Sequence, residues 1–345
     1  MRKHISVDST LAALLAAPRT VAIAAVAMLG ALTLTPTALA DFTPRTDFTP
    51  HIYWANQNNT IGRANLDGSD VNQTFITGPN GSDGVSVTWQ HVYWSNDNAG
   101  TIGEADLDGS DVNESFVTGG GFPLLMAVAG QHVYWGNFAA DTIGSANLDG
   151  SDVNQSFITG ASNPNGVAVA GRHIYWVNTT SNTIGRANLD GSDVNQAFIT
   201  LTSKPEGIAV TGRHIYWANF GGNTIGRANL DGSNVNQSFI TGASEPYGVT
   251  VAGQHIYWAN FGGNTIGRAN LDGSNVNQSF ITGATNPLGV AVTGAGHGFR
   301  LRDRGWCGRD AWGCDGIHRD HGPFSSRWER RHEPHRRSLS GPIRS

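Results

Sequence analysis

Carboxylate side chains recur at short spacing along this 345-residue chain and resemble the ligand loops of calcium-binding proteins. One copy reads Asn65-Leu66-Asp67-Gly68-Ser69-Asp70, and the next copy places acids at Asp106, Asp108 and Asp111. An EF-hand loop also needs a distal bidentate Glu and two flanking helices, and here Glu114 alone comes near that position. Asp-Gly is also a preferred pair for tight turns. We therefore expect turns and no cofactor, and a calcium site at Asp106, Asp108 and Asp111 is the weaker alternative.

Six histidines precede a Tyr-Trp pair and are the chain's candidates for acid–base chemistry. They are His51, His91, His132, His173, His214 and His255. General acid–base catalysis needs one base beside one distinct partner, whereas these six positions are equivalent. The repeats contain no nucleophile elbow, phosphate-binding loop or HExxH zinc motif. We expect a structural role, with pH sensing as the alternative, and we predict no catalytic residue.

These histidines mark an internal repeat of about 41 residues, a period typical of propellers and solenoids. In the fifth copy, Asp-Gly and Gly-rich turns separate four apolar segments at His214–Asn219, Thr224–Leu230, Asn236–Thr241 and Gly248–Ala252. Four strands and four turns in this length leave no room for a helix and fit one propeller blade. The sequence predicts an all-β fold, a six-bladed β-propeller of four-stranded antiparallel blades over residues 51–293.

The repeated motifs resemble a known family. Tyr-Trp-x-Asn, Ile-Gly-Arg-Ala-Asn-Leu-Asp-Gly and Pro-x-Gly-Val-x-Val recur in the same order, and they resemble the class B (YWTD) repeats of low-density-lipoprotein-receptor propellers. That family has Asp where this chain has Asn56, Asn96, Asn137, Asn178, Asn219 and Asn260. An amide keeps one acceptor and adds donors, so a structural role survives this change more readily than a charge-dependent one.

The resemblance also implies that the Pro-x-Gly strand is innermost in each blade and the Tyr-Trp strand second. The six inner-strand candidates are Gly84–Val87, Leu125–Val128, Gly166–Val169, Gly207–Val210, Gly248–Val251 and Gly289–Val292. Residues 41–50 read DFTPRTDFTP and offer no inner strand to the first blade. We predict that Gly289–Val292 joins the first blade and closes the ring, which leaves only short, protected edges.

Binding residues are expected where the copies differ, because variable loops on a rigid scaffold usually carry recognition. The turns that enter the inner strands vary between copies, and strand alternation brings them to the same end as the turns after the Tyr-Trp strands. The predicted binding residues on this face are Phe122, Phe138, Lys204, Glu206, Phe220, Glu245, Tyr247 and Phe261. The resemblance implies recognition of a protein or a cell-surface glycan. We expect a monomer and no nucleic-acid partner.

Two other functions stay open. Asn-Thr-Ile-Gly-Arg-Ala-Asn-Leu-Asp-Gly also resembles the repeats of virginiamycin B lyase, which implies a metal-dependent enzyme with a unique His and Glu arrangement. Every histidine of the repeats occupies the repeated position, and this disfavours catalysis. The chain could also be a truncated repeat array without retained function.

The two ends of the chain differ from the repeats in composition. Residues 1–40 combine early basic residues, an apolar run and the pattern Ala38-Leu39-Ala40, which is typical of a secretory signal peptide. We therefore expect export to the cell envelope or medium, no membrane anchor after cleavage, and a linker over residues 41–50. The Arg-rich residues 294–345 are interpreted as a disordered extension or an out-of-frame remnant. A basic polymer-binding arm and a zinc site are weaker alternatives there, and export would permit a disulfide between Cys307 and Cys314.

Overall fold

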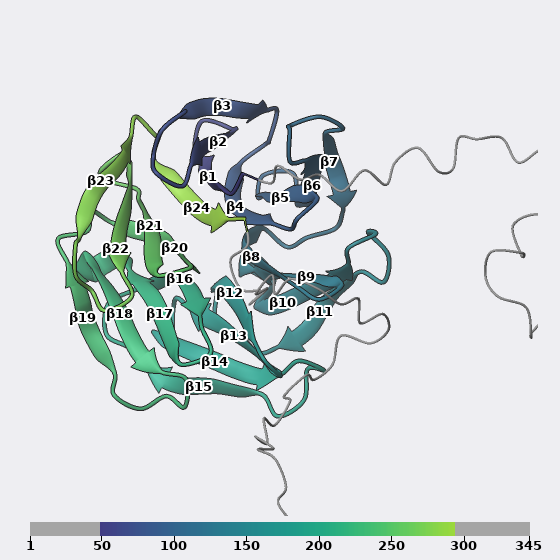
Figure 1. The fold of residues 1–345 in the computed structure, drawn as a ribbon. Helices are drawn as coiled ribbons and strands as arrows, with labels where there is room; N and C mark the ends of the chain where they lie inside the picture. The colour runs from purple at the N-terminus through teal and green to yellow at the C-terminus, as the bar shows by residue number, and fades with distance from the viewer. Residues whose placement is uncertain (1–48, 294–345) are drawn as a thin grey trace, which may run out of the picture. The chain divides into compact units, whose positions relative to one another are not determined.

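Six four-stranded antiparallel sheets surround a central axis in the computed structural model, which describes residues 49–293 (Figure 1). The prediction of a six-bladed β-propeller is confirmed. No helix among these residues is long and apolar enough to cross a bilayer. The predictions for residues 1–48 and 294–345, including the pairing of Cys307 with Cys314, lie outside the described residues.

Each blade runs outward from an inner strand near the axis to a short outer strand. The first blade contains β24 (Pro287–Val292), β1 (His51–Asn56), β2 (Thr60–Asn65) and β3 (Asn72–Thr77). The second contains β4 (Ser82–Val87), β5 (His91–Asn96), β6 (Thr101–Asp106) and β7 (Asn113–Val117). The third contains β8 (Pro123–Ala129), β9 (His132–Asn137), β10 (Thr142–Asn147) and β11 (Asn154–Thr159).

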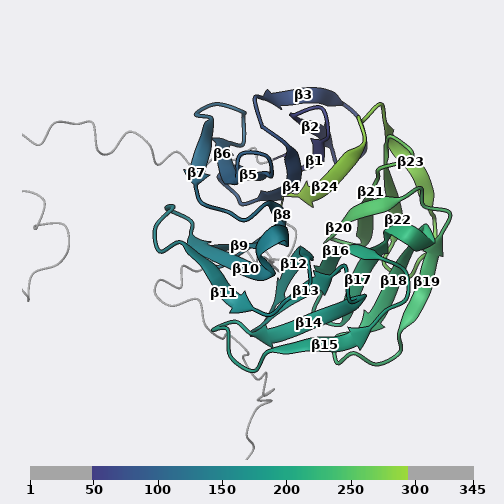
Figure 2. The same cartoon turned by 180° about the vertical axis from the view of Figure 1, so that it is seen from behind.

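The other three blades repeat this order. The fourth contains β12 (Pro164–Ala170), β13 (His173–Asn178), β14 (Thr183–Asn188) and β15 (Asn195–Thr200). The fifth contains β16 (Pro205–Val210), β17 (His214–Asn219), β18 (Thr224–Asn229) and β19 (Asn236–Thr241). The sixth contains β20 (Pro246–Ala252), β21 (His255–Asn260), β22 (Thr265–Asn270) and β23 (Asn277–Thr282). Single 3-10 turns, η3 (Phe138–Ala140) and η4 (Phe220–Gly222), follow β9 and β17. Figure 2 shows the same ring from behind, with the inner strands next to the axis.

The ring closes as predicted, because the last described strand completes the first blade. β24 pairs with β1 in antiparallel register, with Ile52 opposite Val292 and Trp54 opposite Val290. One backbone hydrogen bond extends the junction, from Thr293 N to the His51 carbonyl at 3.0 Å, and His51 N donates to Thr293 Oγ1 at 2.7 Å. The inner strands begin earlier than the sequence suggested, as β20 starts at Pro246 and not at Gly248. Proline is tolerated there because the first residue of a strand need not donate to the ladder.

The Gly of each Ile-Gly-x motif is required by the Trp of the neighbouring strand. Trp54 on β1 is fully buried and sits opposite Gly62 on β2. A methyl group on Gly62 would overlap the Trp54 indole ring, and the corresponding glycine in every other blade meets its own Trp in the same way. The repeated Gly is therefore the space into which the indole packs.

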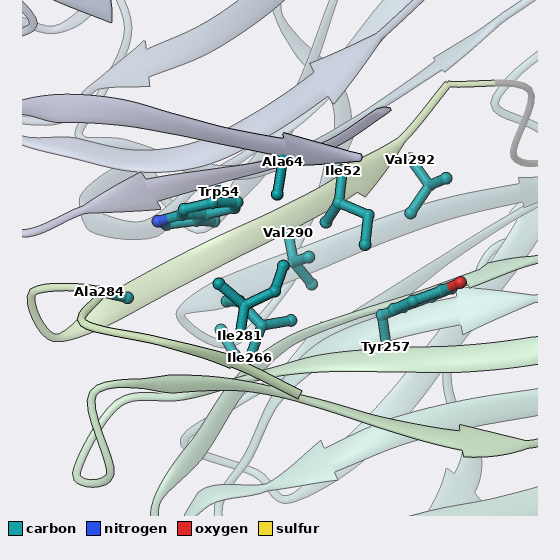
Figure 3. Close-up of a cluster of buried hydrophobic side chains, with 10 residues drawn as sticks. Ile52, Trp54, Ala64, Tyr257, Ile266, Ile281, Ala284, Val290 and Val292 are labelled. Atoms are coloured by element: carbon teal, nitrogen blue, oxygen red, sulfur yellow. The ribbon is translucent and has the colours of Figure 1, made fainter. Parts of the chain in front are cut away.

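The core lies between blades as well as within them. Figure 3 shows one such layer, where Ile52 and Trp54 of the first blade face Tyr257, Ile266 and Ile281 of the sixth. Equivalent clusters join the other blades, which explains why the strands are apolar on both faces. Burial of both faces removes strict alternation as a sequence signal.

The repeated Asn after Tyr-Trp uses both halves of its amide. Asn56 is 1% exposed, and its Nδ2 donates to Thr60 Oγ1 at 3.1 Å and to the Gln73 carbonyl at 3.1 Å. Its Oδ1 accepts from Thr285 N at 3.0 Å. A carboxylate could accept but not donate in this position. The amide therefore fixes the two turns at this end of the blade, and this is a structural role.

The Arg side chains of the Ile-Gly-Arg motifs pair within their own blades. Arg63 lies 4.1 Å above the ring of Phe75, from β2 to β3. Arg186, Arg227 and Arg268 make the same contact with the outer-strand Phe of their blades. Each guanidinium therefore covers the outer-strand Phe ring of its own blade.

Candidate functional site

One position in each inner strand varies between blades, with five residue types among the six. It is the second residue of the strand, and its occupants form a ring around the axis, which we call the axial ring. The axial ring consists of Asp83, Leu124, Asn165, Glu206, Tyr247 and Leu288. The residue that follows is Gly in five blades, and in β16 a methyl group on this Gly207 would overlap the backbone of β20. This close packing of inner strands holds the axial ring tightly together.

The polar members of the axial ring form one hydrogen-bonded network across the axis. Asn165 Nδ2 donates to Glu206 Oε2 at 2.6 Å and to the Tyr247 hydroxyl at 2.9 Å. The Tyr247 hydroxyl in turn donates to Asp83 Oδ2 at 3.4 Å. Lys204 Nζ lies 3.3 Å from Glu206 Oε1. Side chains from the second, fourth, fifth and sixth blades therefore meet at this end of the axis.

Burial shifts the acidic groups of the network toward their neutral forms. Burial raises the pKa of Asp83 well above its usual range, and the charges of Asp97 and Glu206 add to the effect. Burial also raises the pKa of Glu206, despite hydrogen bonds that favour its charged form. The pKa of Asp97 is raised by burial as well. The pKa of Tyr247 rises well above its usual range through burial and the two nearby acids Asp83 and Glu206. Perturbed groups that meet at a cavity are typical of functional sites.

A cavity of about 430 Å³ opens above this network and is walled by turns of several blades. Its lining residues are Gln57, Asn59, Gly81, Ser82, Asp83, Asp97, Asn98, Lys204, Phe220, Tyr247, Phe261 and Leu288. The Phe220 ring packs against Tyr247 and Phe261, with centroid distances of 6.3 and 6.1 Å. One wall is therefore aromatic and another carries carboxylates.

The structure brings together half of the predicted binding residues. Lys204, Phe220, Tyr247 and Phe261 line the cavity, and Lys204 Nζ lies 4.6 Å above the Phe220 ring. The other four predicted residues do not line the cavity. Glu206 lies beneath it as a buried member of the axial ring.

The remaining three predicted residues lie in turns at the same end. Glu245 accepts from Phe261 N through its backbone carbonyl at 3.2 Å. Phe122 and Phe138 form a separate aromatic pair in the third blade, with centroids 6.3 Å apart. This pair is a second aromatic cluster at the same end of the propeller, outside the cavity.

Three turns on this face hold unfavourable residues in the left-handed backbone region. Phe122, Lys204 and Glu245 have φ values of 64°, 39° and 48°, and two other blades have Asn at the same position. Asn tolerates this region, whereas a left-handed conformation costs other L-residues about 1–2 kcal/mol. Strain that is retained at a cavity rim points toward function.

Sequence reasoning missed the carboxylates of the cavity. Asp83 escaped notice because the second repeat reads Gly81-Ser82-Asp83-Gly84, without the Pro that marks this turn in the other blades. Asp97 follows the repeated Asn96 in a turn whose sequence varies between blades and is the same only in the fifth and sixth. A comparison of the residue two places before Val85 with its equivalents would have found Asp83.

The histidines and the Asp-Gly turns lie at the opposite end of the blades. His91 lies 3.3 Å from Glu104 and 3.4 Å from Asp106. The pKa values of His51, His214 and His255 are lowered, chiefly by burial and then by the neighbouring Arg. None of the described residues that line the cavity is a histidine.

Two of the three carboxylates suggested for calcium, Asp106 and Asp108, have partners within the protein. Asp108 Oδ1 accepts from Ser110 N at 3.0 Å and from its hydroxyl at 2.6 Å, as expected of an Asx turn. Over residues 49–293, no group of three His, Cys, Asp or Glu side chains is arranged to hold a metal ion. The described residues therefore do not fit a metal held by the protein alone.

Comparison with known proteins assigns a family. The family model described as the virginiamycin B lyase family matches residues 51–261, more than half of the chain. No curated protein matches the chain. Among solved structures, a chain of a nidogen/laminin complex is similar at 20% identity and a TM-score of 0.62, covering 70% of this chain and 98% of that chain. A catalytically inactive virginiamycin B lyase variant from Staphylococcus aureus, solved with quinupristin, is 20% identical at a TM-score of 0.49, covering 61% and 73%.

The likeness to the chain of the nidogen/laminin complex shows a shared fold. The class B repeat stays a resemblance, since the matching family model is a different one. The second resemblance of the repeats, to virginiamycin B lyase, is the one that the family model supports. The chain belongs to the virginiamycin B lyase family.

Proposed function

We propose that this protein is an exported, non-catalytic binding protein that recognises a protein or a cell-surface glycan at the cavity end of the propeller. The observation that carries the proposal is the axial ring. Five residue types occupy six equivalent positions there, while the rest of the inner strand repeats closely. Because these side chains differ, the symmetric scaffold has one asymmetric site. Ligands usually bind in concave sites that carry a few polar groups.

The cavity rim supports recognition of a large ligand. Phe220 and Phe261 line the cavity and are half-buried. Aromatic side chains are enriched among residues that dominate binding energy. The strained turn keeps Lys204 at this rim at a conformational cost that the fold itself does not require, because Asn occupies the same position in two other blades.

The test compares two aromatic sites on the same face. A double Phe220→Ala and Phe261→Ala variant should lose capture of a partner from cell-surface extract, whereas Phe122→Ala, outside the cavity, should retain it. The captured partner is then purified, and its Kd is measured against all three proteins. Equal affinity for wild type and the double variant, with both folded by thermal melting, would rule out the cavity as the binding site.

The second candidate is a lyase, which family membership favours. Asp83 faces the cavity with a raised pKa, and a carboxyl poised nearer to neutral pH can act as a general base. Virginiamycin B serves as the test substrate, in buffer with added Mg²⁺. Turnover that disappears in Asp83→Asn supports the lyase, and the absence of turnover by the folded wild-type protein counts against it.

A further inference from the structure

The cavity holds two carboxylates with oxygens that lack hydrogen-bond partners. Asp83 is 5% exposed and lines the cavity, and its Oδ1 has no partner. Asp97 also lines the cavity, and its buried Oδ1 has no partner either. Buried carboxylate oxygens ordinarily find donors, so a missing donor at a cavity wall suggests that a ligand supplies it.

The cation already present does not satisfy these two groups. Among the described residues, the ion pair of Lys204 Nζ is with Glu206 Oε1 at 3.3 Å and not with Asp83 or Asp97. Burial raises the pKa of Asp83 most, and the negative charges of Asp97 and Glu206 raise it further, because each added negative charge raises the cost of ionising its neighbour. A positive group in the cavity would relieve this repulsion.

The aromatic wall fits the same chemistry. Lys204 places an alkylammonium 4.6 Å above the Phe220 ring, within cation–π range. The protein thus shows with its own side chain how an ammonium on a flexible stem sits against this wall. Phe261 and Tyr247 extend the wall along the cavity, beside the carboxylate of Asp83.

We propose that the cavity binds a lysine side chain of a partner protein, whose ammonium donates to Asp83 Oδ1 and Asp97 Oδ1 while its stem lies along Phe220 and Phe261. This rests on the proposed binding function and specifies its partner as a protein that presents an exposed lysine. The stem buries apolar carbon against the rings, and the ammonium supplies the donors that the two carboxylates lack.

The experiment titrates full-length protein with Nα-acetyl-L-lysine amide and follows binding by NMR or calorimetry. The matched ligand is the same compound acetylated at Nε, which keeps the stem and loses the charge. We expect the charged probe to bind at least about tenfold more tightly than its acetylated form, a difference of about 1.4 kcal/mol. Added salt should weaken binding only modestly, since a partly buried ion pair is screened much less than an exposed one.

Three variants locate the probe. Asp83→Asn and Asp97→Asn keep side-chain size and remove charge, and each should weaken binding at least about tenfold. Asp193→Asn is the matched control, because Asp193 lies in an Asp-Gly turn at the opposite end where the fifth and sixth copies have Asn234 and Asn275. It should bind as wild type does. Thermal melting confirms that all three variants are folded.

Several results would overturn the inference. They are equal binding of both probes, unchanged affinity in Asp83→Asn and Asp97→Asn, or no binding of the charged probe. Tighter binding of glucosamine than of the lysine amide would assign the cavity to an amino sugar instead. If partner capture still depends on Phe220 and Phe261 while the lysine probe fails, the proposed binding function stands and the lysine inference falls.

Discussion

The Nδ2 of Asn165 donates to the hydroxyl of Tyr247 across the propeller axis, over 2.9 Å and between blades that are not neighbours. This bond holds the phenol where it can also donate to Asp83. The buried Asp83 thereby gains one donor for Oδ2, while its Oδ1 has none. The network thus places an incompletely satisfied acid at the floor of the cavity.

Asp83→Asn should stabilise the protein at neutral pH. A carboxyl with a raised pKa in the folded state contributes stability at low pH, and that contribution is lost as pH rises through the folded pKa. The amide keeps an acceptor for Tyr247 and never ionises. Calorimetry should show a Tm increase of about 2–4 °C at pH 7, the shift that 1 kcal/mol gives a domain of this size. Below the ordinary Asp pKa, at about pH 3, the difference should vanish. A lower Tm at pH 7 would mean that Asp83 is stabilised by a charge partner.

Glu114→Gln should strengthen the junction between the first and second blades. In four blades a Gln at this position donates to a Thr carbonyl of the preceding blade, as Gln73 does to Thr282 at 3.0 Å. The Glu114 carboxylate has no N–H group to donate to such a carbonyl, and its Oε1 lacks a hydrogen-bond partner. We expect a gain of about 0.5–1.5 kcal/mol in the free energy of unfolding, measured in urea.

The reverse change, Gln73→Glu, provides the control for this junction. It should lower the free energy of unfolding by a similar amount, because it removes the existing bond to Thr282. If both substitutions shift stability in the same direction, the bond between blades is not the cause.

Gly62→Ala should destabilise the first blade by about 1–3 kcal/mol, since the added methyl overlaps the indole of Trp54 and forces the packed layer apart. Denaturation followed by Trp fluorescence measures the change. Gly212→Ala is the control, because its Cβ would meet open space. It should stay within about 0.5 kcal/mol of wild type. Equal effects at the two sites would refute the packing role of Gly62.

Truncation after residue 286 should expose the edge of β1 and cause self-association, because β24 is removed while β1 keeps unpaired backbone groups. Size-exclusion chromatography with light scattering measures the mass. A second truncation, after residue 293, retains β24 and should have the mass of its own monomer. A stable monomer from the shorter form would show that closure of the first blade is dispensable.

The sequence predicted the architecture because every blade repeats the same local code. Strands and turns are set locally by the motifs His-x-Tyr-Trp, Ile-Gly and Asp-Gly. Counting the inner-strand motifs predicted that β24 closes the ring. The cavity was predicted only in part, for a physical reason. Its floor joins Asp83, Asn165 and Tyr247 from three blades, and their meeting depends on how the ring curves. Local patterns place a residue at one end of a blade but do not show which residues reach across the axis.

Closure by β24 also sets an order on biosynthesis. β1 leaves the ribosome almost a full propeller before its inner partner, a delay on the order of tens of seconds at typical translation rates. During that interval the nascent first blade presents an open edge, which is the kind of surface that holdase chaperones shield. A circular permutant that joins residues 287–293 to residue 51 through a short linker would remove the delay and keep the pairing of β24 with β1.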